Sequence, residues 1–301
     1  MEFIISAVSD VGISKSVNQD GLFVSKGKTS AGNVAFAVMC DGMGGFSFGE
    51  IASTALVEAF SEWFLQQFPC LSKTEICDEK IVQQWTAVAK AVNKKIKRFG
   101  TEKQCRLGST ITVLLLTEER YFIMNIGDTR AYVLKKIANQ LTVDHTLIEH
   151  QIRLGNISRK QADISSMRNV ITRCVGVTEE VYPDFFFGTT KKEAVYLLCT
   201  DGFRHKISEE EILNEFSKNV IHDSGEVYKS LTSLVALNKE RKEKDNISVI
   251  SIITKNESID IDAVADGYDD VTVRLPDMEE SENTDFMVEE IISYTYSDTI
   301  L

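Results

Sequence analysis

Aspartates at the ends of apolar segments are the residues of this chain best suited to do chemistry. Asp41 follows the unbroken apolar run 34–40 and directly precedes Gly42. Asp201 follows the apolar run 194–199 after a single threonine, and it also precedes a glycine. A short, continuous apolar run is typical of a strand buried on both faces. The pattern therefore predicts two carboxylates held rigidly at the rim of a core.

Two further aspartates lie next to apolar segments. Asp245 comes just before the run 247–253, and Asp128 lies in a turn between two more such runs. Carboxylates that gather at one rim repel one another, and a hard divalent cation relieves the repulsion. Oxygen donors without Cys or His favour Mg²⁺ or Mn²⁺, and two such ions about 3.5–4 Å apart support phosphate-ester hydrolysis. The alternative is that several of these residues are ordinary turn aspartates.

The elements that must position these acids can be predicted from hydrophobic periodicity. Apolar positions recur at spacings of three and four over residues 51–64, where Pro69 is expected to end the helix, and again over residues 81–96. Short helical pieces are expected near 145–154 and 158–163, within a polar and irregular segment. The remaining expected strands are 3–8, 21–26, 111–117, 121–126 and 131–136, and the remaining helices are 209–216 and 227–237. Strands in runs, separated by a helix pair, predict an α+β fold with antiparallel sheets covered by helices.

Composition excludes several classes of protein. The 301 residues include six scattered cysteines with no CxxC pair, which argues against a zinc site and for reduced thiols. The first ten residues lack the basic start and apolar core of a signal peptide, and no apolar run approaches the length of a membrane span. We therefore expect a cytoplasmic protein that does not bind membranes.

The charge is distributed unevenly along the chain. Residues 256–301 contain 14 acidic residues and one Arg, whereas residues 1–255 contain 31 acidic and 32 basic residues. Neither part has the basic face that nucleic-acid binding requires. The C-terminal segment is predicted to be a partly disordered or partner-binding acidic tail. Within it, residues 269–275 are expected to form a short strand or docking motif, and residues 286–292 a short helix.

Nine short motifs follow one another in a recognisable order. They are VNQD at 17–20, DGMGG at 41–45, GExAS at 49–53, GST at 108–110, NIGDTRAY at 125–132, DHT at 144–146, RNVITRCVG at 168–176, LLCTDGF at 197–203 and KDNISVI at 244–250. Over residues 3–254 the sequence resembles the metal-dependent serine/threonine protein phosphatases, the PPM or type 2C family, and its bacterial members most. Each motif alone is a weak signal, but nine in order are a strong one.

The resemblance implies a fold and an activity. The fold would be a central β-sandwich of two antiparallel sheets with helices on both sides, an αββα four-layer arrangement over residues 1–255, with a flap at about 145–193. The reaction would be hydrolysis of phosphoserine or phosphothreonine in proteins by a metal-bound water or hydroxide, with two Mg²⁺ or Mn²⁺ ions and a third, weaker one. The substrates would be proteins phosphorylated by a bacterial serine/threonine kinase. The resemblance does not cover the tail 256–301, for which the unusual charge alone suggests a regulatory partner or an autoregulatory role.

The same resemblance assigns roles to individual residues. Asp41 would bridge the two metals, and the Gly42 carbonyl would complete one of them. Asp201 and Asp245 would hold the other metal. The remaining assignments are Asp20 acting through bound water, Asp128 at the third metal site, Asn246 steadying Asp245 and Lys15 binding the substrate phosphate.

Three positions depart from the family pattern. Lys15 stands where many members have Arg, and a lysine offers phosphate a point charge rather than a planar fork. Met43 stands where some members have a His, and Phe46 also replaces a His, so protonation of the leaving group would fall to water or another group. The alternative function is a catalytically weak phosphatase-like regulator that binds phosphoproteins or a partner. A calcium-binding structural protein is disfavoured because no EF-hand spacing is present.

Overall fold

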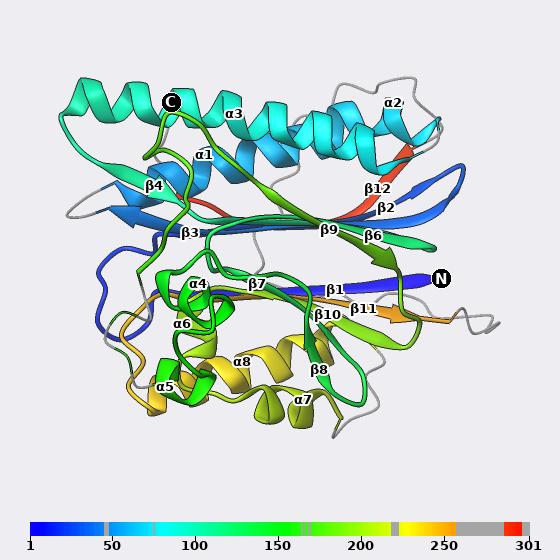
Figure 1. The fold of residues 1–301 in the computed structure, drawn as a ribbon. Helices are drawn as coiled ribbons and strands as arrows, with labels where there is room; N and C mark the ends of the chain where they lie inside the picture. The colour runs from blue at the N-terminus through cyan, green and yellow to red at the C-terminus, as the bar shows by residue number, and fades with distance from the viewer. Residues whose placement is uncertain are drawn as a thin grey trace.

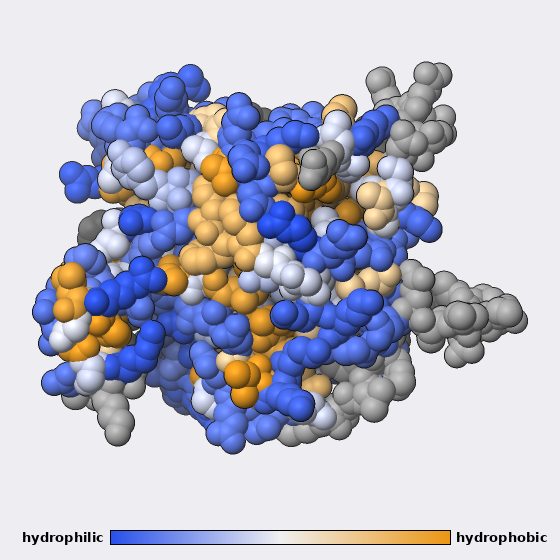
Figure 2. Space-filling model, turned by 45° about the vertical axis from the view of Figure 1, so that its right-hand side comes forward, coloured by the Kyte–Doolittle hydropathy of each residue, from blue (hydrophilic) through white to orange (hydrophobic). Residues whose placement is uncertain are grey.

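A computed structural model describes residues 1–44, 48–74, 76–163, 165, 167, 170–217, 223–256 and 286–296. Two antiparallel sheets lie face to face, and helices cover the outer face of each (Figure 1). The predicted α+β sandwich with four layers is therefore confirmed. Figure 2 shows a surface on which apolar patches alternate with polar side chains. Within the described residues, no helix combines the length and the apolar character that crossing a bilayer requires.

The first sheet has five strands, and aspartates of the candidate site lie next to the ends of three of them. The strand order is β1-β11-β10-β7-β8, and every pairing is antiparallel. The apolar runs predicted at 194–199 and 247–253 form its two central strands, where both faces are covered. The strands are β1 (Glu2–Asp10), β7 (Arg130–Leu134), β8 (Ala138–Gln140), β10 (Ala194–Cys199) and β11 (Ile247–Lys255).

The second sheet has seven strands and contains the long strand that carries Asp41. The order is β12-β2-β3-β5-β6-β9, and β4 pairs with the end of β3. Its strands are β2 (Asp20–Thr29), β3 (Gly32–Gly44), β4 (Leu107–Ser109), β5 (Ile111–Thr117), β6 (Arg120–Ile126), β9 (Asp184–Thr189) and β12 (Phe286–Tyr294). Strands β4, β8 and β9 were not predicted, because β4 and β8 have only three residues each and β9 interrupts a polar segment.

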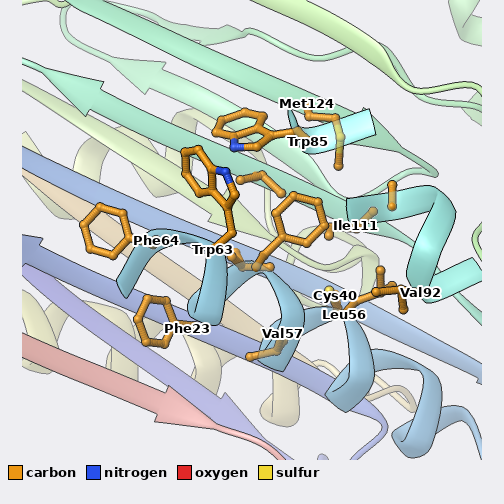
Figure 3. Packing of buried hydrophobic residues seen from close by; sticks show 14 of the residues in the cluster. Phe23, Cys40, Leu56, Val57, Trp63, Phe64, Trp85, Val92, Ile111 and Met124 are labelled. Carbon is orange, nitrogen blue, oxygen red and sulfur yellow. The ribbon is translucent and has the colours of Figure 1, made fainter. Parts of the chain in front are cut away.

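Helices α1 (Gly49–Glu62) and α3 (Asp78–Lys103) cover the outer face of the seven-stranded sheet. Their apolar stripes enclose an aromatic core in which the rings of Trp63 and Trp85 meet edge to face at 5.4 Å (Figure 3). Phe36 of β3 stacks on Phe64 at 4.7 Å in the same cluster. Burial of such rings supplies much of the driving force that holds this helix layer on the sheet.

The first helix does not stop before Pro69, as the sequence had suggested. A π-helical segment, η1 (Trp63–Gln67), leads into α2 (Phe68–Ser72), and Pro69 lies in the first turn of that helix. Proline is compatible with the first helical turn because the N–H it lacks has no intrahelical partner there. Pro69 therefore begins a new helix rather than ending the helical region.

The other helices lie on the five-stranded sheet or beside it. Helices α6 (Asp201–Arg204), α7 (Glu209–Ser217) and α8 (Ser224–Glu240) enclose a second apolar cluster on its outer face. Helices α4 (Leu147–Arg153) and α5 (Arg159–Asp163) lie in the predicted flap. Between the sheets, a third cluster includes Ile5, Met39, Leu114 and Ile250, all fully buried. This layer fixes the two sheets relative to each other, and with them the strand ends that carry the acids.

The predicted helix at 286–292 is wrong, because these residues belong to β12. The predicted strand or docking motif at 269–275 lies outside the described residues. The division into a phosphatase domain at 1–255 and a tail at 256–301 stays a prediction, although β12 shows that part of the tail segment pairs with the sheet.

Candidate metal centre

Asp20 and Asp41 face each other across neighbouring strands. Asp20 begins β2, Asp41 lies near the end of β3, and their Cα atoms are register partners. Thr110 fixes the backbone of Asp41 on the other side, because its Oγ1 accepts from the Asp41 N–H at 3.0 Å and its own N–H donates to the Asp41 carbonyl at 2.9 Å. Ser109 Oγ donates to the same carbonyl at 3.0 Å. The GST motif thus holds Asp41 in place.

Gly42 occupies a position with no room for a side chain. A Cβ atom there would lie 2.2 Å from the Gly49 carbonyl oxygen and 2.5 Å from that of Gln19. The Gly42 N–H also donates to the Gln19 carbonyl at 3.1 Å. Close backbone packing therefore explains the glycine, in addition to the carbonyl ligand that the family resemblance implies.

Asp201 and Asp245 come from opposite ends of neighbouring strands, β10 and β11. Asp201 is the first residue of α6, and Asp245 lies two residues before β11. Gly202 brings them together, since a Cβ at Gly202 would lie 3.2 Å from the Cβ of Asp245 and 2.1 Å from the Asn246 carbonyl oxygen. Both acids are half-buried. The antiparallel pairing of the two strands therefore delivers both carboxylates to one rim of the sandwich.

Asn246 connects this rim to the loop before β2. Its Nδ2 donates to the carbonyls of Val11 at 3.0 Å and Val17 at 3.1 Å, and its Oδ1 accepts from the Gln19 N–H at 3.0 Å. Its own N–H donates to Asp245 Oδ1 at 2.9 Å. The side chain is buried, and it ties the loop that carries Lys15 and Asp20 to the end of β11.

Lys15 lies at the acidic cluster and is exposed. Its Nζ is 2.9 Å from Asp245 Oδ1. Burial opposes its charge, but the hydrogen bond to Asp245 and the charges of Asp245, Asp41 and Asp201 raise the pKa of Lys15. Its ammonium group therefore interacts electrostatically with three of the four aspartates that were predicted from their positions beside apolar runs.

Asp128 is buried and paired with an arginine that the sequence analysis did not single out. Arg204 Nη2 donates to the Asp128 carbonyl at 3.1 Å and lies 3.4 Å from its Oδ2. Arg204 also lies 3.7 Å from Asp144, which Arg130 holds at 2.7 Å. Asp128 Oδ1 has no hydrogen-bond partner. One oxygen of this buried carboxylate thus lies near the Arg204 guanidinium, and the other is buried without a hydrogen-bond partner.

The electrostatics show that the acids share one neighbourhood. Burial, followed by the charges of Asp20, Asp201, Asp128 and Asp245, raises the pKa of Asp41 well above its usual range. Burial and the charges of Asp201 and Asp245 raise the pKa of Asp20 to about 7. Burial and Asp201 likewise raise the pKa of Asp128 to about 7. A site with this excess of negative charge favours a bound cation.

The side chains nevertheless do not surround a common point as they stand. No three His, Cys, Asp or Glu residues in the described part of the chain are arranged to hold one metal ion. Four acids face other partners instead: Thr200 Oγ1 lies 3.2 Å from Asp20, His205 Nε2 lies 3.4 Å from Asp201, Lys15 contacts Asp245, and Arg204 contacts Asp128. Metal ligation therefore requires side-chain rotations. The donor set itself, oxygen atoms with excess negative charge, fits Mg²⁺ or Mn²⁺.

Sequence reasoning missed two of the groups that contact these acids, Arg204 beside Asp128 and His205 beside Asp201. His205 Nδ1 lies 3.7 Å from Glu243, and the hydrogen bond from His205 and two backbone N–H groups lower the pKa of Glu243 to about 2 despite its burial. Arg204 and His205 directly follow the LLCTDGF motif, which was the only available signal. Their partners are distant in sequence, and spacing does not reveal such contacts.

The structure shows the surroundings of Met43, which departs from the family pattern, and of Arg173 in the predicted flap. Met43 lines a surface pocket with Leu107, Ile171 and Val177. Arg173 Nη1 pairs with Asp184 at 2.8 Å. Phe46 and Arg168 lie outside the described residues.

Comparison with known proteins identifies the family. The family model described as protein phosphatase 2C matches residues 13–237. Serine/threonine phosphatase stp of Listeria monocytogenes serotype 4b (strain F2365) is 29% identical over 254 residues, which is 81% of this chain and 93% of that protein.

Two solved structures have the same fold. The Stp1 serine/threonine phosphatase of Staphylococcus aureus superposes with a TM-score of 0.72 at 24% identity, covering 85% of this chain and 96% of that one. The catalytic domain of the PstP serine/threonine protein phosphatase, in complex with two manganese ions, superposes with a TM-score of 0.66 at 26% identity, covering 85% and 100%. With its sandwich, its gathered acids and a family match over most of its length, this chain belongs to the protein phosphatase 2C family.

Proposed function

We propose that this chain removes phosphate from phosphoserine and phosphothreonine residues of proteins, with two divalent cations held at the rim that carries Asp41, Asp201 and Asp245. Family membership makes it a metal-dependent serine/threonine protein phosphatase. The residue assignment rests on one observation, the placement of these aspartates at the strand ends that β2, β3, β10 and β11 bring to the same rim.

The assigned ligands follow from position and donor chemistry. Asp41 would bridge the two ions, the Gly42 carbonyl would complete one, and Asp201 and Asp245 would hold the other. Asp20 would act through water, and the unpartnered Oδ1 of Asp128 is the atom available to a third, weaker ion. When bound, such ions lower the pKa of water and stabilise charge on a phosphoryl group. The two manganese ions in the PstP structure favour Mn²⁺, with Mg²⁺ as the alternative.

Residues of the chain itself would bind the substrate phosphate and hold the metal ligands in position. Lys15 places an ammonium group beside the acids, where it can exchange Asp245 for a phosphate oxygen of the substrate. Thr110 fixes the backbone of Asp41, and Asn246 fixes the loop that carries Lys15. The candidate site residues thus lie on strand ends and a loop that two buried side chains, those of Thr110 and Asn246, hold in position.

Hydrolysis of p-nitrophenyl phosphate and of a phosphothreonine peptide tests this function. We expect turnover that requires Mn²⁺ or Mg²⁺ and stops with a chelator. Asp41→Asn and Asp201→Asn should each lower the turnover number on the order of 100-fold or more. Glu102→Gln, on an exposed face of α3, is the matched control and should have no effect. Full activity in both aspartate variants would contradict the assignment.

One observation favours the second candidate, a catalytically weak regulator that binds phosphoproteins. Lys15 is a single point charge already engaged by Asp245. Metal binding and phosphopeptide binding without turnover would support this candidate. In either case, we propose that the partners are phosphoproteins made by a bacterial serine/threonine kinase, in keeping with the bacterial relatives.

A further inference from the structure

The last described segment, residues 286–296, extends beyond the family match, which ends at residue 237. Residues 286–294 form β12, which pairs antiparallel with β2 from Phe286 opposite Thr29 to Tyr294 opposite Leu22. Figure 1 shows β12, in red, along the edge of the seven-stranded sheet next to β2. Without β12, the hydrogen-bonding edge of β2 would have no partner strand on this side.

Side-chain contacts hold β12 at both ends and in its middle. The ring of Phe286 meets Phe64 and Phe68 edge to face at 5.5 and 5.7 Å. Glu290 lies 3.3 Å from Lys26, and its carbonyl accepts from Ser25 Oγ at 2.9 Å. Beyond the strand, the Tyr296 N–H donates to Thr54 Oγ1 of α1 at 3.1 Å. The attachment therefore combines an aromatic anchor, an ion pair and a backbone ladder.

β12 contributes only partly buried side chains to the core: Phe286 and Ile291 pack on the aromatic cluster, and Ile292 and Tyr294 pack on the cluster between the sheets. None of its residues is fully buried, whereas the first six residues of β2 all are. Phe23 of β2 belongs to the aromatic cluster, and Leu22 and Val24 belong to the cluster between the sheets, so β2 is fixed by its own side chains. An element held mainly by an edge ladder and a few contacts opens at lower free energy than a core strand.

A long stretch of chain separates β12 from β11 in the sequence. Residues 257–285 join it to β11, and a chain of this length can extend on the order of 100 Å. This connecting segment contains 11 acidic residues and one Arg. Docking of β12 is therefore comparable to the binding of a tethered peptide to a sheet edge, where the tether supplies a high effective concentration.

We propose that the outer edge of β2 is a strand-docking site, which this chain fills with its own residues 286–296 as a tethered and replaceable ligand. The site takes an extended segment with an aromatic residue at its start and an acidic residue four positions later, as in Phe286 and Glu290. A partner protein that presents such a segment takes the same edge and frees the acidic tail. The proposal rests on the β12 contacts alone and does not depend on the metal chemistry.

Cutting the connection in the full chain tests the proposal. A protease recognition sequence is inserted within residues 257–285, and the purified protein is cleaved, so that only docking retains the C-terminal fragment. We expect the fragment to co-elute with the phosphatase domain on size exclusion at micromolar concentration. An excess of fluorescent peptide corresponding to residues 284–298 should replace it, as measured by a rise in fluorescence anisotropy.

Two control peptides make the result decisive. A scrambled peptide of identical composition and charge should not replace the fragment, and a Phe286→Ser peptide should compete about tenfold less well, because it lacks the aromatic anchor. A fragment that stays bound but is never replaced would show that β12 is a permanent part of the fold. Immediate loss of the fragment, or equal competition by the scrambled peptide, would also overturn the proposal.

Discussion

Lys15 is the residue whose contribution is most open to measurement. Lys15→Met removes the ammonium group that lies 2.9 Å from Asp245 but keeps a side chain of similar length. If Lys15 binds the substrate phosphate, the KM for p-nitrophenyl phosphate should rise about tenfold, equivalent to about 1.4 kcal/mol, with a smaller change in kcat.

Lys15→Arg is the matched control for this experiment, because it keeps the charge and adds a fork that fits phosphate. Steady-state kinetics of both variants, at saturating Mn²⁺, should place Arg at or below the wild-type KM. An unchanged KM in Lys15→Met would mean that the lysine serves only as a partner of Asp245.

Gly42 offers a second measurement at the level of one residue. Gly42→Ala places a methyl group 2.2 Å from the Gly49 carbonyl oxygen, so the α1 start or the Gln19 loop must move. We expect a loss of about 1–3 kcal/mol in the free energy of unfolding, together with weaker Mn²⁺ binding, measured by denaturant unfolding and calorimetry. Met43→Ala, next to it in a surface pocket, should leave Mn²⁺ binding intact. Equal Mn²⁺ affinity in Gly42→Ala and wild type would show that the backbone here is not part of the site.

At this scale the sequence predicted acids well and their partners poorly. Asp41 and Asp201 were recognisable because each follows an apolar strand and precedes a glycine, which is a local pattern. Arg204 and His205 could not be assigned in the same way, because their contacts with Asp128 and Glu243 form only when distant strand ends meet. Local patterns report where a side chain is presented, whereas pairing between distant groups depends on the fold.

Among the elements, the loop between β1 and β2 is tied to the start of β11 by the buried side chain of Asn246. Asn246 donates to the carbonyls of Val11 and Val17 and accepts from Gln19. Asn246→Ala leaves these backbone groups without their partner, so we expect a loss of about 1–3 kcal/mol in stability and weaker Mn²⁺ binding. Thermal unfolding and calorimetric titration measure the two effects.

Asn156→Ala is a control for the Asn246 variant, because Asn156 is exposed and bonds only within the flap. It should change neither quantity. If Asn246→Ala lowers stability but leaves Mn²⁺ affinity unchanged, the loop does not help to position the acids.

The element that the sequence predicted wrongly is β12, and the reason is a bulge. Val288, Ile291 and Ile292 are spaced at i, i+3 and i+4, which is also the spacing of a helix face. In the structure the register shifts between Val288 and Glu290, so the alternation expected of a strand is interrupted. Ile291 then packs on the helix-covered side of the sheet and Ile292 on the side between the sheets. Two apolar faces and one bulge imitate helical periodicity.

For the whole molecule, the layered architecture follows from where the apolar runs lie. Central strands β3, β5, β10 and β11 are apolar along nearly their full length because both of their faces are covered, by the other sheet and by helices. This pattern could be recognised in the sequence. The pairing order of the strands could not, since register and neighbour choice depend on contacts between segments far apart in the chain.

The same architecture makes metal binding a stabilising contribution to the entire sandwich. The rim joins ends of strands from both sheets, so an ion that binds Asp41 together with Asp201 and Asp245 crosslinks the two layers. An ion present at about 100 times its Kd adds about 2.7 kcal/mol to the free energy of unfolding. In a domain of this size that corresponds to a rise in Tm of about 5–10 °C. Differential scanning calorimetry with Mn²⁺ and with a chelator measures the rise.

The acidic segment 256–301 makes the control for this prediction important, because its 14 acids can attract Mn²⁺ without any defined site. A double variant, Asp41→Asn with Asp201→Asn, keeps that segment unchanged and removes only the rim ligands. We expect the Mn²⁺-dependent rise in Tm to disappear in the double variant and to persist in wild type at 0.15 M salt, where diffuse attraction is largely screened. A rise of equal size in both proteins would place the ion on the acidic segment and would remove the support that ion binding gives to the rim as the metal centre.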